Sequence, residues 1–269
     1  MRIRALLAGL VAAVVWASAA SGSPPLPNSI ASIGDSITRA TNVCCWYGDH
    51  PAQSWSTGGG YFDGVSSHYE RLRALTPSIR GNNYNNARAG ARMADAPQQA
   101  QAAVAQGTRY VTILMGANDV CTSSPAAMTS VEDFTAQFSA TMNVLAAGLP
   151  PGALVFVSSI PNVYRLWQVL RDNAVAQLVW RAARICQSML SPFNMEEDRR
   201  AVLERERAFN EILGNVCAQY AFCRFDGHAV FDYPFASHHV SRLDFFHPSL
   251  AGQATLATLT WSKSWWGSS

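Results

Sequence analysis

The fold is decided by the stretch Ile30-Ala31-Ser32-Ile33-Gly34-Asp35-Ser36-Ile37-Thr38. Its apolar half, which ends at Gly34, is typical of a short interior strand in a parallel sheet, because helices cover both faces of such a strand. In open α/β sheets, ligands bind just beyond the carboxyl ends of the strands. Ser36 follows that end directly. We therefore consider its hydroxyl a candidate nucleophile and ask which residues activate it.

The rest of the chain alternates between strand patterns and helix patterns. Strand patterns lie at 82–87, 110–115, 154–158 and 223–226, and helix patterns lie at 65–75, 95–106, 131–147, most of 163–220 and 249–265. Such alternation is typical of a parallel sheet with helices on both faces. The sequence therefore predicts an α/β fold built on a central parallel sheet of about five strands.

The N-terminus has the features of a secretory signal peptide. Residues 1–4 carry two arginines, residues 5–15 are apolar, and small residues follow at 17–21. We expect residues 1–20 to be cleaved and residues 21–269 to form a single domain, since about 245 residues suffice for one core. No apolar run reaches the ~20 residues that span a bilayer, so we expect a secreted, extracellular protein without an integral membrane segment.

The charges nearly balance in the mature chain. Cleavage of the signal peptide removes Arg2 and Arg4, which leaves 18 basic residues against 18 acidic ones. Nucleic acids and anionic membranes attract proteins that carry a basic field. We therefore expect no nucleic-acid partner, and we expect a monomer that acts on a small molecule.

All six cysteines lie in the exported part, at positions 44, 45, 121, 186, 217 and 223. An even number of cysteines in an exported chain predicts disulfides, although six cysteines allow 15 connectivities. We favour Cys217 with Cys223, which are close in sequence, and Cys121 with Cys186. Cys44 and Cys45 are adjacent and need either a strained vicinal bridge or another pairing. No C-x-x-C spacing occurs, which disfavours a zinc site.

A nucleophilic serine needs a base, and His247 is the best candidate. Asp244 precedes it by three residues, so its carboxylate can fold back onto the imidazole, fix the tautomer and stabilise the imidazolium. The alternative is that Asp244 caps the last helix and His247 packs at its start. We interpret His238 and His239 as surface or rim residues, because they lack an offset carboxylate.

Two further residues follow strand patterns and are candidates for oxyanion binding. Gly90 allows a backbone N–H to approach a substrate oxygen closely, and the Asn118 amide is a hydrogen-bond donor. The alternatives are a turn glycine and a helix cap. Asp35 is acidic and adjacent to Ser36, but we expect it to accept backbone hydrogen bonds within its own turn.

The segment from residue 41 to 63 is a long irregular loop rich in Gly, Trp, Tyr and Ser. Its glycines at 58–60 precede no Lys-Ser/Thr, so we interpret the loop as a flexible wall of a cleft and not as a phosphate cradle. Its aromatic residues either line an acyl pocket or pack in the core. The tryptophans at 261, 265 and 266 likewise either meet a lipid interface or pack in the core.

Four ordered sequence blocks resemble those of the SGNH/GDSL hydrolases: Gly34-Asp35-Ser36-Ile37, Gly90, Gly116-Ala117-Asn118-Asp119 and Asp244-Phe245-Phe246-His247-Pro248. The resemblance implies a flavodoxin-like three-layer α/β/α fold with no metal or organic cofactor. It also implies that Ser36 is the nucleophile, that His247 is the base oriented by Asp244, and that Ser36, Gly90 and Asn118 form an oxyanion hole. Within the family, Ser54-Trp55-Ser56 and Cys121 are similar to the phospholipase B-like branch.

The sequence thus predicts a secreted serine hydrolase that cleaves carboxylic esters of lipids or other acyl groups through an acyl-enzyme. A standard α/β-hydrolase is disfavoured, because the G-x-S-x-G elbow is missing. The alternatives are a carbohydrate acetylesterase or an acyltransferase of the same fold, a non-catalytic flavodoxin-like binding module, and a degenerate family member that binds without turnover.

Overall fold

The computed structural model describes residues 23–267, and its centre is a sheet of parallel strands. The strands are β1 (Ile30–Gly34), β2 (Asn83–Asn85), β3 (Tyr110–Leu114), β4 (Leu154–Val157) and β5 (Cys223–Phe225). Their order is β2-β1-β3-β4-β5, and every neighbouring pair is parallel. This order reverses the direction of the chain between β1 and β3, which is the position where doubly wound sheets open a crevice.

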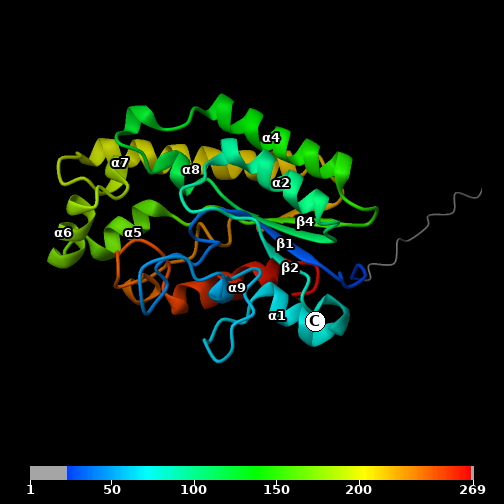
Figure 1. The fold of residues 1–269 in the computed structure, drawn as a ribbon. Coiled ribbons are helices and arrows are strands. Elements are labelled where there is room, and N and C mark those ends of the chain that lie inside the picture. The colour runs from blue at the N-terminus through cyan, green and yellow to red at the C-terminus, as the bar shows by residue number, and fades with distance from the viewer. Residues whose placement is uncertain (1–22, 268–269) are drawn as a thin grey trace, which may run out of the picture.

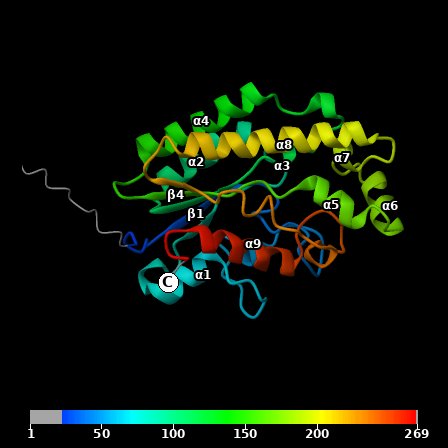
Figure 2. The same cartoon turned by 180° about the vertical axis from the view of Figure 1, so that it is seen from behind.

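Helices cover the sheet in two layers (Figures 1 and 2). One layer holds α2 (Ala96–Ala105), α4 (Val131–Gly148) and α8 (Glu196–Cys217), and the other holds α1 (His68–Leu75) and α9 (Leu250–Lys263). Shorter helices, α3 (Ala117–Val120), α5 (Val163–Leu170), α6 (Ala174–Ala182) and α7 (Gln187–Leu190), lie toward the end of the molecule at which the strands finish. The predicted three-layer α/β/α fold is confirmed.

Helix boundaries follow local capping chemistry. The α1 pattern was expected to start at residue 65, but the helix begins only after Ser67, whose hydroxyl accepts a hydrogen bond from Glu70 N while the Glu70 side chain returns to Ser67 N. This reciprocal capping satisfies two otherwise unpaired amides. Ser130 caps α4 and Ser249 caps α9 through the hydroxyl alone, which accepts from Asp133 N and Gly252 N respectively.

The core on the α1/α9 side is aromatic. Trp266 stands edge-on to Tyr110 at 5.1 Å between ring centroids, and Trp261 and Trp266 are 9% and 3% exposed. His68 is fully buried there, with hydrogen bonds to the Tyr110 hydroxyl and to Thr260 Oγ1, both of 2.9 Å. Burial lowers the pKa of His68 to about 3, so its ring is neutral. Trp261 and Trp266 are therefore core residues, and they do not face a lipid interface.

Both predicted disulfides are present. Cys121 pairs with Cys186, and Cys217 pairs with Cys223. The first bond joins the end of α3 to the residue before α7, and the second joins the end of α8 to the start of β5. Each bond closes a loop and so restricts the unfolded chain. Cys44 and Cys45 belong to neither pair.

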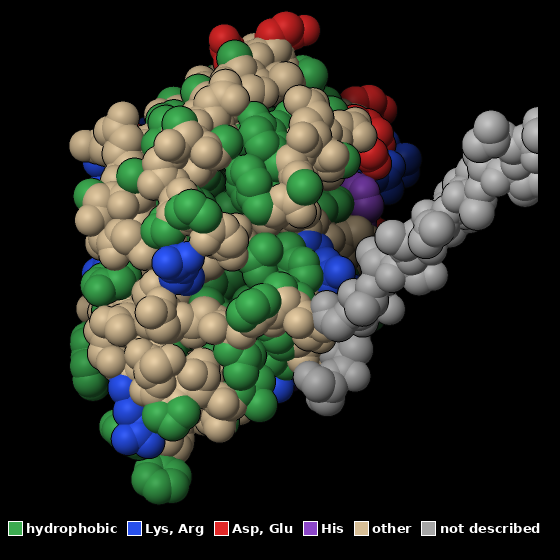
Figure 3. All heavy atoms as spheres, turned by 90° about the vertical axis from the view of Figure 1, so that its right-hand side faces the viewer, with side chains coloured by type: hydrophobic (Ala, Val, Ile, Leu, Met, Phe, Trp, Pro, Cys, Tyr) green, Lys and Arg blue, Asp and Glu red, His purple; other side chains and the backbone are tan. Residues whose placement is uncertain are grey.

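Within residues 23–267, no helix is long and apolar enough to cross a membrane. Figure 3 views the molecule from the side opposite α6 and shows basic side chains scattered among hydrophobic and neutral ones. The expected signal peptide at 1–20 lies outside the described residues.

Candidate active site

The turn that carries Ser36 is held by buried side chains from two helices. The Gln99 side chain of α2 accepts a hydrogen bond from Gly34 N at 2.8 Å and donates one to Gly34 O at 3.0 Å. On the other side, Gln253 of α9 donates to Ile37 O at 2.7 Å. A Cβ atom at Gly34 would lie 2.5 Å from Thr38 Oγ1, so only glycine fits this close turn. Core contacts therefore fix the position of Ser36.

Asp35 accepts a hydrogen bond within this turn, as its position next to Ser36 predicted. Its Oδ1 accepts from Ile37 N at 2.8 Å, whereas Oδ2 is buried with no hydrogen-bond partner among the described residues. Burial raises the pKa of Asp35 to about 7, although the hydrogen bond from Ile37 N and the nearby His247 oppose the rise. Ionisation of this carboxyl therefore costs free energy in the folded state.

The Asp244–His247 turn has the geometry of an oriented histidine. Asp244 Oδ2 lies 2.6 Å from His247 Nδ1, and Asp244 Oδ1 accepts from the backbone N–H groups of Phe246 and His247 at 2.9 and 3.0 Å. Burial raises the pKa of Asp244, but the hydrogen bonds from His247, Asn42 and Phe246 outweigh it and hold the pKa below its usual value. Since Ser249 caps α9, the alternative of Asp244 as the helix cap is wrong.

One cavity of about 450 Å³ brings the predicted site residues together: Ser36, Gly90, Asn118, Asp244 and His247 all line it. Within the described chain, neither Ser36 Oγ nor His247 Nε2 has a hydrogen-bond partner, so the cavity holds both groups unpaired. The rest of the lining comprises Thr41, Asn42, Tyr47, Ala89, Cys121, Val179, Ala183, Ile185, Cys186, Leu243 and Phe246.

The Asn118 side chain is hydrogen-bonded to Ala91, the residue that follows Gly90. Asn118 Nδ2 donates a hydrogen bond to Ala91 O at 3.0 Å, which ties the segment after β3 to the segment after β2. Gly90 has a φ of 78°, in the region that favours glycine, and nothing lies within 4 Å of where its Cβ would be. Its backbone therefore borders open space in the cavity.

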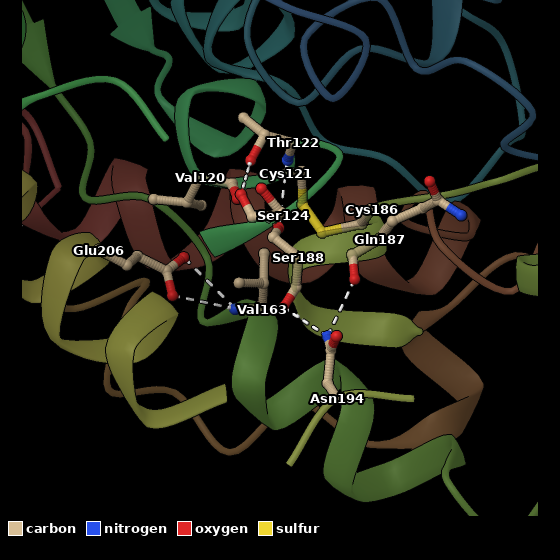
Figure 4. Close-up of a disulfide and its surroundings, with 10 residues drawn as sticks. All are labelled: Val120, Cys121, Thr122, Ser124, Val163, Cys186, Gln187, Ser188, Asn194 and Glu206. Carbon is tan, nitrogen blue, oxygen red and sulfur yellow. Dashed lines mark hydrogen bonds between the residues drawn. A yellow bond between two sulfur atoms is a disulfide. The ribbon is translucent and has the colours of Figure 1, made fainter. Parts of the chain in front are cut away.

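Cys121 and Cys186 both line the cavity, so their disulfide forms part of its wall. Figure 4 shows this disulfide and the residues around it. Beside it, Ser188 Oγ donates to Val120 O at 2.6 Å and accepts from Thr122 N at 3.1 Å. Ser188 N also donates to Thr122 O at 2.8 Å. The end of the short helix α3, which carries Asn118, is thus fastened to α7 by a covalent bond and three hydrogen bonds. These contacts restrict movement of the Asn118 amide.

A second, apolar pocket of about 70 Å³ also borders His247. It shares Phe246 and His247 with the larger cavity, and its remaining lining is mostly aliphatic and aromatic: Ile37, Ala117, Pro161, Asn162, Val163, Leu166, Val169, Phe235, His239, Val240, Pro248 and Leu256. The start of α5, which forms one wall, is held by the buried Glu206 carboxyl, which accepts from Val163 N at 3.2 Å (Figure 4). Burial raises the pKa of Glu206 well above its usual value.

Some expectations about the surrounding residues are wrong. Ser54-Trp55-Ser56 is fully buried, and Trp55 bonds to Gln253 and Thr38, so this part of the long loop does not line the cavity. Its earlier part, through Thr41, Asn42 and Tyr47, forms the wall instead. His239, expected at the surface or rim, is buried, and its Nδ1 accepts a hydrogen bond from Ala236 N at 3.0 Å.

Three supporting residues were missed from the sequence. Asn42 donates to Asp244 Oδ2 at 2.7 Å across 202 positions, while Gln99 and Gln253 hold the Ser36 turn. No local motif marks these residues, because each acts on a partner that is distant in sequence. Among residues 23–267, no group of three or more His, Cys, Asp or Glu side chains is placed to hold a metal ion.

Comparison with known protein families identifies the class of enzyme to which the chain belongs. The model of the GDSL-like lipase/acylhydrolase family matches residues 32–255, and the chain belongs to this family. The protein is accordingly a carboxylic ester hydrolase that acts on small-molecule substrates. Comparison with curated protein sequences yields no significant match.

Several solved structures share the fold. An α/β hydrolase enzyme from the metagenome of Lake Arreo, Spain, is 17% identical, with a TM-score of 0.58 over 93% of this chain and 99% of that one. A GDSL-like lipase from Parabacteroides merdae is 17% identical, with a TM-score of 0.51 over 87% and 94%. The acetyl xylan esterase AlAXEase is 13% identical, with a TM-score of 0.52 over 87% and 98%. At such identities the likeness concerns the fold alone.

Proposed function

We propose that the protein cleaves acyl esters through a covalent intermediate on Ser36. The observation that carries the proposal is the 2.6 Å contact between His247 Nδ1 and Asp244, at the wall of the same cavity that Ser36 lines. A carboxylate on Nδ1 leaves Nε2 of the ring as the base. His247 takes the proton of Ser36 as Oγ attacks the ester carbonyl, and it then returns the proton to the leaving alcohol. Water repeats the cycle and releases the acid.

The oxyanion is stabilised by Ser36 N–H, Gly90 N–H and the Asn118 side chain. Gly90 and Asn118 line the cavity together with Ser36. Asn118 Nδ2 donates one hydrogen to Ala91 O, which leaves its second hydrogen for substrate. Preorganised donors of this kind stabilise the charge that develops in the transition state.

The substrates are lipid or other acyl esters. The apolar pocket beside His247 supports this class, because a short aliphatic chain buries its surface there while the ester group remains beside Ser36 in the larger cavity. The Ser54-Trp55-Ser56 segment gives no support to a phospholipase, since its side chains are buried away from the cavity. We further propose that the protein is secreted after removal of residues 1–20 and that residues 21–269 form one domain. The two disulfides support secretion, because disulfides persist in oxidising extracellular compartments.

The test is release of p-nitrophenol from acetyl, butyryl, octanoyl and palmitoyl esters by the wild type and by Ser36→Ala. We expect butyrate to octanoate to be favoured and the variant to lose at least about 10³-fold in kcat. Unchanged turnover by Ser36→Ala would contradict the nucleophile assignment. A strong preference for acetate, together with release of acetate from acetylated xylan, would favour a carbohydrate acetylesterase instead. New esters formed in the presence of added alcohol would favour an acyltransferase.

A further inference from the structure

The loop between β1 and α1 contains a pair of adjacent cysteines close to the active site. Cys44 and Cys45 are the cysteines outside the two disulfides, and their sulfur atoms lie 2.6 Å apart. Cys45 is exposed and Cys44 is half-buried, so oxidants have access to the pair. Because the other four cysteines are bonded, each of these two has the other as its nearest partner.

We infer that Cys44 and Cys45 form a disulfide with each other, and that this bond fixes the loop that supports Asp244. The second half of this inference rests on the proposed function. A disulfide reagent of low molecular weight supplies the oxidising equivalents: one thiolate attacks it and expels a thiol, and the second thiolate displaces the remaining thiol. Two cysteine thiols are thereby oxidised to one disulfide, while the reagent is reduced to two thiols.

The backbone around the pair is a closed turn. Cys45 has a φ of 65°, and Trp46 N donates to Cys44 O at 2.7 Å. Asn42 N donates to Gly48 O, and Gly48 N donates to Asn42 Oδ1, each at 2.8 Å. The sulfurs are therefore brought together by a turn whose ends are already hydrogen-bonded. Adjacent Cα atoms are about 3.8 Å apart, below the usual range of about 4.4–6.8 Å for disulfides, so the bond is readily reduced.

The cysteine pair lies between Asn42 and Tyr47, the two residues that connect this loop to the Asp244–His247 turn. On its N-terminal side, Asn42 Nδ2 donates to Asp244 Oδ2 at 2.7 Å, and on its C-terminal side the Tyr47 hydroxyl donates to Leu243 O at 2.9 Å. Ser241 Oγ also donates to Asn42 O. A covalent link between Cys44 and Cys45 restricts the backbone between both anchors at once. Reduction frees this backbone and weakens the orientation of Asp244 and His247.

The first experiment counts thiols in the purified full-length chain, denatured without reductant and treated with iodoacetamide. We expect no alkylation, and a peptide containing both cysteines that is lighter by two hydrogens than its reduced form. Alkylation of Cys44 and Cys45 would overturn the inference, and so would a dimer linked through either residue. This result does not depend on catalysis, so it stands or fails separately from the assignment of Ser36.

The second experiment measures the effect on the active site. We expect the double variant Cys44→Ser/Cys45→Ser to reduce kcat about threefold to tenfold with KM within about twofold, because orientation is lost and not substrate contact. Mild dithiothreitol should lower the wild-type kcat equally and leave the variant unchanged. Cys217→Ser/Cys223→Ser, at the edge of the sheet, is the matched control and should retain kcat. Equal kcat for wild type and the Cys44/Cys45 variant would refute the role in fixing the loop.

Discussion

The turn of Ser36 and the turn of His247 are held in place in different ways. Ser36 follows an interior strand, and its turn is fixed from both faces of the sheet by Gln99 and Gln253, which are buried. The Asp244–His247 turn lies in the irregular connection between β5 and α9, and its outer support is a hydrogen bond from Asn42 in a surface loop. The core thus determines where Ser36, the proposed nucleophile, lies, whereas loop contacts determine how His247, the proposed base, is oriented.

The largest effect on kcat is expected from a substitution of Asp244, the carboxylate of the Asp244–His247 turn. Asp244→Asn keeps the size of the side chain but removes the charge that fixes the ring tautomer, so kcat should fall about 10³–10⁴-fold. The melting temperature should change little, because the Asn oxygen can still accept from the backbone amides of Phe246 and His247. A loss of less than about tenfold would mean that His247 is oriented by other contacts.

The next largest effect is expected on the free energy of unfolding, when the hydrogen bonds between Gln99 and the Ser36 turn are removed. Gln99→Leu leaves Gly34 N without its acceptor in a buried position, which should lower the free energy of unfolding by ~2–3 kcal/mol. Gln98→Leu is the matched control, since Gln98 lies on the same helix but is exposed, and it should cost less than ~0.5 kcal/mol. Urea unfolding measures both values, and equal midpoints for the two variants would show that Gln99 does not support the turn.

Asp35 adds a pH dependence to the Ser36 turn. Its pKa in the folded protein, about 7, lies above the ordinary value of 3.8, so its contribution to stability is present at low pH and is lost as the pH rises toward 7. Between pH 5 and 8 the wild type should lose roughly 2.5 kcal/mol relative to Asp35→Asn, which cannot ionise. Unfolding of both proteins in urea at pH 5, 6.5 and 8 tests this, and parallel pH curves would contradict the raised pKa.

The smallest effect on kcat is expected from a substitution of Asn42, which supports the Asp244–His247 turn from the surface loop. Asn42→Ala removes one donor from Asp244 while the bond to His247 remains, so kcat should fall about threefold to tenfold. Asn82→Ala is a suitable control, because the Asn82 side chain donates to backbone oxygens at Asn28 and Ser78, and Asn82 does not line the cavity. If both variants keep wild-type kcat, the backbone amides and His247 alone hold Asp244.

The sequence predicted the regular parts of the molecule well. Each strand pattern became a strand. For β1, β3 and β4 the reason is that short apolar runs bounded by turns have few alternatives once helices separate them. The boundaries were less accurate: α1 begins at His68 because Ser67 and Glu70, three residues later, cap the helix reciprocally. The role of the 54–60 segment was also misjudged, since its polar and glycine residues pack tightly against the core.

The sequence by itself determined the strand ends at Ser36 and Asn118 and the Asp244–His247 spacing, because these depend on local patterns and on chemistry between near neighbours. It favoured two cysteine pairs, but Cys121 and Cys186 are 65 positions apart, so the fold decided that they meet. Only the tertiary structure decided that Asn42 supports Asp244, that Gln99 holds Gly34, and that an apolar pocket lies beside His247. These contacts join residues far apart in the chain. Their partners are chosen by the packing of helices and loops on the sheet, which leaves no local signal in the sequence.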